Sequence, residues 1–120
     1  MTLLDGRPAL EAFAEAAGET PDTFRFEDFM EYMPGVMVDG EPVIRGGSRI
    51  FEDGSLQFFI TIKEGRRLTV MRAGDIVGCS CEVLAAKKAK LVSISALLAF
   101  DCVYRNMILR PKNEIVEYLS

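Results

Sequence analysis

The chain has 120 residues, a formal net charge of −4 and no histidine, with 49% hydrophobic and 27% charged residues. These values are ordinary for a globular protein, so we expect one domain over residues 1–120 and not a disordered chain. The acidic balance and the scattered basic residues argue against a nucleic-acid partner, and no apolar run reaches the length of a membrane span.

The absence of histidine excludes several classes of site. It removes the Ser-His-Asp and Cys-His arrangements of nucleophilic enzymes. It also removes the usual ligands of zinc, non-haem iron and haem, so we expect neither a metal nor a cofactor; haem held by Cys or Tyr is chemically allowed but disfavoured. The chain has three cysteines, and Cys79 and Cys81 are only two apart. This is not a disulfide framework, and we expect a reducing, cytoplasmic compartment.

Two helices are predicted at the start of the chain. The first should cover Arg7 to Ala17, because its apolar residues recur at helical spacing and Gly18 can close it. The second should follow the cap at Thr20-Pro21 and end at Pro34-Gly35. Its apolar face would consist of Phe26, Phe29, Met30 and Met33.

From Val36 to Met71 the pattern changes to the alternation that is typical of strands. Asp39-Gly40 is a strong hairpin signal, with Val36 to Val38 before it and Val43 to Arg45 after it. Asp53-Gly54 is a second such signal, and Arg67 to Met71 reads as the strand that ends this stretch. We expect these strands to form one antiparallel meander.

A third helix should run from Gly74 to Lys88, with Asp75 near its positive end. The basic cluster at its other end suits the helix dipole better than a phosphate-binding patch. Its predicted apolar face consists of Ile76, Cys79, Val83 and Ala86. Because cysteine is often buried, we expect at least one of Cys79 and Cys81 to be a structural core residue.

The stretch from Leu91 to Arg105 is rich in Val, Ile and Leu and reads as a strand that is covered on both faces. The predicted fold class is therefore α+β: an antiparallel β-meander with a central apolar strand, packed with three to four helices. A last short helix should open at Pro111, with Ile115, Val116 and Leu119 as its apolar positions.

Candidate site residues lie where this predicted strand ends, because sheet proteins often bind ligands there. Arg105 and Arg45 could each receive a carboxylate, and Asp101 could receive an amine. With Cys102 and Tyr104 beside them, they suit a small amino-acid-like ligand. The structural alternative is an Asp101–Arg105 ion pair at the strand end, with Cys102 as a small core residue.

Two other classes of function stay open. Cys102 could be the nucleophile of a cysteine-dependent enzyme, although no base stands beside it in the sequence. The chain could also be a structural assembly module without a ligand.

Several short motifs follow one another along nearly the whole chain, and their order and spacing form a pattern. They are Asp5-Gly6 with Pro8-Ala9-Leu10, Pro34-Gly35 to Val38, Val43-Ile44-Arg45, Asp53-Gly54-Ser55, Glu64-Gly65, Val70-Met71-Arg72 and Phe100 to Arg105. Together they resemble the C-terminal domain of the FIST family, whose apolar strand ends in a Cys-x-x-Arg motif like Cys102 to Arg105.

This resemblance implies a non-enzymatic sensory domain that binds a small molecule and passes the signal to a partner domain. The family's usual Gly-Phe and Tyr-Gly-Glu continuation and its N-terminal domain are absent, so we expect an excised fragment or a short stand-alone relative. A sheet without its last strand exposes an edge from Ile94 to Phe100. We therefore expect a homodimer whose contact covers this edge.

Overall fold

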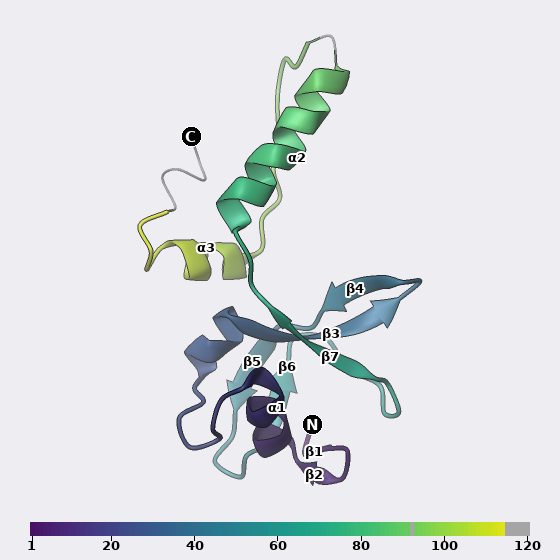
Figure 1. The fold of residues 1–120 in the computed structure, drawn as a ribbon, viewed down its shortest axis with the longest axis vertical. Helices are drawn as coiled ribbons and strands as arrows, with labels where there is room; N and C mark the ends of the chain where they lie inside the picture. The colour runs from purple at the N-terminus through teal and green to yellow at the C-terminus, as the bar shows by residue number, and fades with distance from the viewer. Residues whose placement is uncertain (92, 115–120) are drawn as a thin grey trace. The chain divides into compact units, whose positions relative to one another are not determined.

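The computed structural model describes residues 1–91 and 93–114. The chain divides into two compact units, Met1–Ala73 and a second that begins at Gly74, and each is described here by itself (Figure 1). The described residues contain three α-helices and three small antiparallel sheets, which confirms the α+β class.

The first predicted helix is confirmed as α1, Ala9–Ala17. Its apolar spacing buries Phe13 and Ala14, and Gly18 ends it in the left-handed conformation at φ 82°. Glycine adopts this conformation without the steric cost that a Cβ brings. The helix begins later than predicted because Arg7–Pro8 (β2) pairs with Leu3–Leu4 (β1) in a small hairpin.

The second predicted helix is wrong. Only a 3-10 turn, η1, covers Phe26–Met30, and the chain then enters the strand β3, Tyr32–Val38. Four consecutive residues of β3, Met33 to Val36, are buried. A strand that is covered on both faces has no alternating pattern, so its apolar residues could be read at helical spacing.

The largest sheet has the order β4-β3-β7, with β4 at Glu41–Ile44 and β7 at Leu68–Arg72. The predicted Asp39-Gly40 hairpin is confirmed: both residues have positive φ, 51° and 84°, as a type I′ turn requires. Both strands pair antiparallel with β3 (Figure 1).

The prediction of one continuous meander is wrong, because β5 (Gly47–Ile50) and β6 (Leu56–Phe58) form a separate two-stranded sheet. The backbone of β5 lies directly against η1. A Cβ placed on Gly47 would come within 2.6–2.8 Å of the Phe29 ring, closer than real Cβ contacts allow. The β5–β6 hairpin thus covers the aromatic core and does not extend the larger sheet.

The core of the first unit is aromatic. Phe29 is fully buried, and its ring centroid lies 5.4–6.4 Å from four other phenylalanine rings, those of Phe13, Phe24, Phe26 and Phe58. Tilted and edge-to-face contacts of this kind add to the energy of apolar burial. The buried cluster consists of Ala9, Phe13, Ala14, Phe24, Phe29 and Leu56.

The second unit contains α2, Ile76–Lys90, and α3, Val103–Leu109. The predicted third helix is confirmed, and the Asp75 carboxylate caps it by accepting the Gly78 N–H at 2.8 Å. Its basic residues lie in the last turn, where they interact favourably with the helix dipole. Among the described residues of this unit, the buried apolar ones are Val77, Tyr104, Ile108 and Leu109.

The predicted central strand is wrong. Residues 93–102 are irregular, and the following residues start α3. A strand needs a neighbour to pair its backbone groups, and the described part of the second unit contains no other strand. The apolar side chains of the irregular stretch are exposed. Leu98 and Phe100 are the most exposed, with 78% and 90% of their surface accessible.

Two further predictions depend on this region. The homodimer was expected to cover a strand edge from Ile94 to Phe100; without the strand that reason is lost, and the dimer itself stays a prediction. The last predicted helix lies largely outside the described residues, since Ile115, Val116 and Leu119 fall there.

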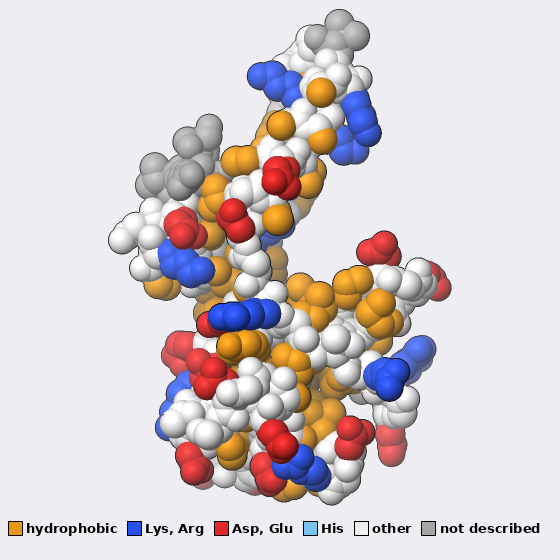
Figure 2. All heavy atoms as spheres, viewed as in Figure 1, with side chains coloured by type: hydrophobic (Ala, Val, Ile, Leu, Met, Phe, Trp, Pro, Cys, Tyr) orange, Lys and Arg blue, Asp and Glu red, His pale blue; other side chains and the backbone are white. Residues whose placement is uncertain are grey.

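The predicted apolar face of α2 is exposed: Val83, for example, has 60% of its surface accessible. Figure 2 shows hydrophobic side chains on the surface over this helix.

Candidate functional site

Arg105 holds α3 to its surroundings within the second unit. Its Nε lies 3.4 Å from Asp101 Oδ1, and its Nη1 donates to Ser80 Oγ of α2 at 3.1 Å. Both side chains of the ion pair are partly exposed. Arg105 and Asp101 are thus brought together as the structural alternative expected, but beside the start of a helix and not at a strand end.

Tyr104 belongs to the core of the second unit, with only 7% of its surface accessible. Burial raises the pKa of its phenol, and the neighbouring Cys102 raises it further. Tyr104 therefore belongs to the buried part of this unit, and its part in a ligand site with Arg105 stays a prediction.

Cys102 precedes α3 as its cap, where its carbonyl oxygen accepts the Arg105 N–H at 3.0 Å. Its side chain is exposed, so the expectation of a small core residue is wrong. Cys79 and Cys81 are exposed as well, and neither is the buried structural cysteine predicted on α2. All three thiols are free.

Arg45 lies in the first unit, directly after β4. Its backbone N–H donates to Pro34 O at 2.8 Å, and its Nη1 donates to Ile44 O at 3.3 Å. Its Nε is buried without a hydrogen-bond partner. Because Arg45 and Arg105 belong to separate units, their joint action on one ligand stays a prediction.

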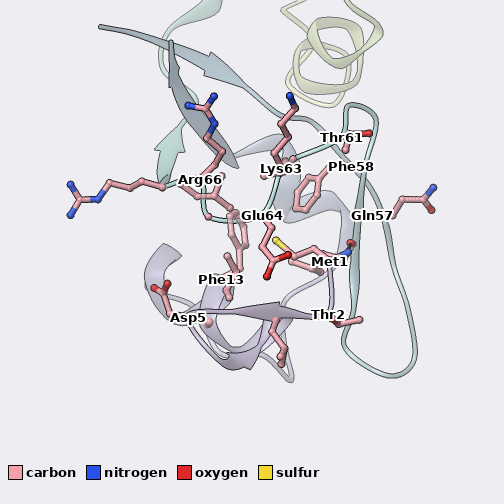
Figure 3. A pocket seen from close by; sticks show the side chains of 18 of the residues that line it. Met1, Thr2, Asp5, Phe13, Gln57, Phe58, Thr61, Lys63, Glu64 and Arg66 are labelled. Atoms are coloured by element: carbon pink, nitrogen blue, oxygen red, sulfur yellow. Dashed lines mark hydrogen bonds between the residues drawn. The ribbon is translucent and has the colours of Figure 1, made fainter. Parts of the chain in front are cut away.

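The feature that sequence reasoning missed is a hollow in the first unit. It has a volume of about 1250 Å³ and lies between the N-terminal hairpin, α1, the β5–β6 sheet and the loop that joins β6 to β7 (Figure 3). These segments are far apart in the sequence, so no local pattern indicates that they enclose one space.

The floor of the hollow is apolar. Phe13 and Leu56 belong to the buried core, and Phe58 packs against it. Ala12 and Ala16 of α1 line one wall, where their small side chains leave the space open. Other apolar lining residues are Leu3, Leu4, Phe51, Ile60, Ile62, Leu68 and Val70.

The rim carries charges of both signs on one tight turn. Lys63, Glu64 and Arg66 all line the hollow; the Arg66 N–H donates to Lys63 O at 3.3 Å, and Gly65 has φ 75°. Figure 3 shows the Glu64 carboxylate extending toward Phe13 and Met1, whereas Arg66 extends away from them.

These charged side chains have no partner among the described residues, either as an ion pair or as a side-chain hydrogen bond. Other arginines do: Arg7 pairs with two glutamates at 2.6–2.7 Å, and Arg72 pairs with Glu31 at 2.6 Å. The sequence signal for this rim is the run of charged residues around one glycine, Lys63-Glu64-Gly65-Arg66-Arg67.

The comparisons with known proteins decide the family. The family model for the FIST C domain matches residues 9–120, almost the whole chain. The chain belongs to the FIST C domain family. This confirms the resemblance seen in the motifs and places the protein in a family assigned to sensory signalling. Among curated proteins and solved structures, none matches the chain.

Two general findings complete the description of this FIST C domain. No helix among the described residues is long and apolar enough to cross a membrane. In the same residues, no group of three or more Cys, Asp or Glu side chains is arranged to hold a metal ion.

Proposed function

We propose that this FIST C domain is a non-enzymatic sensory domain, that it binds a small amino-acid-like ligand in the hollow of the first unit, and that it passes the signal to a partner domain. The observation that carries the proposal is the hollow itself: an apolar floor under a rim whose charges, of both signs, have no partner among the described residues. Binding sites for small molecules combine these two features.

The rim suits a zwitterion. A ligand ammonium group lies best against the Glu64 carboxylate, which extends over the floor (Figure 3). A ligand carboxylate then falls to Lys63 or Arg66, whose long side chains start within two residues of Glu64. Because none of these groups has an intramolecular partner among the described residues, a ligand breaks no existing ion pair when it binds.

The volume supports a ligand of this kind. Sites for small molecules usually measure about 300–1,000 Å³, so about 1250 Å³ leaves room for an amino acid with its bound water. The start of α3 is a weaker candidate, because Arg105 already binds Asp101 and Ser80.

A thermal-shift titration with free amino acids tests the proposal, since a ligand that binds only the folded state raises the melting temperature. We expect Glu64→Gln, and the double change Lys63→Gln with Arg66→Gln, each to abolish the shift. Glu64→Gln keeps the shape of its side chain, and Lys63 and Arg66 are exposed, so these changes should leave the unliganded melting temperature nearly unchanged. Glu82→Gln, on the exposed surface of α2, is the matched control and should bind as the wild type does.

Arg105→Gln distinguishes the two candidate sites. If it alone abolishes the shift, the ligand binds at the start of α3 and the hollow is the wrong site. Rapid alkylation of Cys102 at neutral pH, far above the rate of an ordinary exposed thiol, would instead favour the cysteine-dependent enzyme.

A further inference from the structure

Building on this proposed function, we propose that the hollow selects amino-acid-like ligands with a large apolar side chain, and that Ala12 and Ala16 of α1 determine this specificity. The juxtaposition that supports the proposal is a charged turn, Lys63 to Arg66, above an apolar floor that part of the core provides.

The wall made by α1 is open because its residues are small. Ala12 and Ala16 are four residues apart and therefore lie one above the other on the same face of the helix. Phe13, which follows Ala12, turns into the core. Apart from the buried Phe13 ring, which forms part of the floor, the helix thus presents only the methyl groups of Ala12 and Ala16 to the hollow.

The opposite side offers apolar surface that a ligand can cover. Ile60 is 54% exposed and Phe51 is 37% exposed, and both line the hollow together with the half-buried Phe58. Water at such a surface is released when an apolar group covers it, which favours binding. Each methylene group that becomes buried should strengthen binding about fourfold.

The charged turn fixes the orientation of the ligand. With its ammonium group at Glu64, the ligand's side chain is directed to the floor, since Figure 3 shows the Glu64 carboxylate extending toward Phe13. Glycine and alanine then contact only the charged turn at the rim, whereas the side chains of leucine and phenylalanine also cover the apolar floor.

Calorimetric titration with the series alanine, norvaline, leucine and phenylalanine tests the inference on the full chain. We expect the wild type to bind leucine and phenylalanine at least tenfold more tightly than alanine. Ala16→Leu should weaken binding of leucine and phenylalanine about tenfold and leave alanine within about twofold. Because Ala16 is exposed, the variant should fold normally. Ala85→Leu, at an exposed position of α2, is the matched control and should change nothing.

The outcomes separate the inference from the proposed function. Equal affinity along the series, or an equal loss for all four ligands in Ala16→Leu, overturns the inference while the ligand site stands. No measurable binding of any member overturns the proposed function and the inference together. Ala12→Val gives a second readout at the same wall and should show the same order of effects in a weaker form.

Discussion

The two compact units differ in how their apolar residues are used. In the first unit, Phe29 lies among four other phenylalanine rings and is fully buried. In the second unit, Phe100 has the same side chain but is 90% exposed. The difference teaches that apolar composition alone does not make a core: a strand or helix must also bring a second surface against each side chain.

The largest expected effect comes from removing the central ring of the aromatic core. Phe29→Ala should lower the free energy of unfolding by about 3–5 kcal/mol, because it leaves a cavity among four rings. Phe100→Ala is the matched change in the second unit and should stay within about 0.5 kcal/mol of the wild type. Urea unfolding measures both; similar losses for the two variants would contradict the contrast between the units.

A smaller effect is expected from adding a single methyl group to the same core. Gly47→Ala should cost about 1–3 kcal/mol, because the new Cβ meets the Phe29 ring, which the core holds in place. Gly35→Ala is the control: its Cβ meets the thioether of Met71, a flexible side chain that can move aside. In thermal unfolding, the melting temperature of Gly47→Ala should therefore be lower than that of Gly35→Ala. The reverse order would mean that the core adjusts around Phe29.

The smallest effect concerns the modest core of the second unit. Burial raises the pKa of Tyr104 in the folded chain, so its neutral form contributes stability that is fully present below the unfolded pKa of about 10. This contribution is lost as the pH rises through the folded pKa. Wild type should therefore lose stability relative to Tyr104→Phe above about pH 10. Urea unfolding between pH 8 and 11 measures the difference; a constant difference would show that Tyr104 is accessible to water.

Local signals predicted part of this fold well. Residues that are close in the sequence determine each of three features: the helix α1 with its end at Gly18, the turn at Asp39-Gly40, and the start of α2 at Asp75. The failures involve partners from elsewhere in the chain. Pro34-Gly35 was expected to end a helix, but flanking strands hold it in the middle of β3. The stretch after Leu91 has the composition of a strand and no neighbour among the described residues of its unit.

The candidate site was harder to predict than the fold. The rule that ligands bind at strand ends pointed to Arg105, but the strand does not form, and Arg105 binds Asp101 and Ser80 instead. The hollow combines residues from Met1 to Val70, and its rim was visible only as charges in a turn. What the sequence does not show is that these charges lack partners within the described part of the chain, because that depends on which charged groups the fold brings near them.

Pro34 has a consequence for how the larger sheet avoids misfolding. Its carbonyl oxygen accepts the Arg45 N–H, so the side of Pro34 that lacks an N–H faces the residue just beyond β4. The N–H that Pro34 lacks would therefore lie at the end of the hydrogen-bond ladder between β3 and β4, where its absence leaves no gap inside the ladder. Sliding β4 by two residues keeps every side chain on its own face, yet it would set Pro34 opposite Val43 and leave a carbonyl inside the ladder without a donor. The proline thus penalises a hairpin slippage in this direction, which hydrophobic patterning cannot detect.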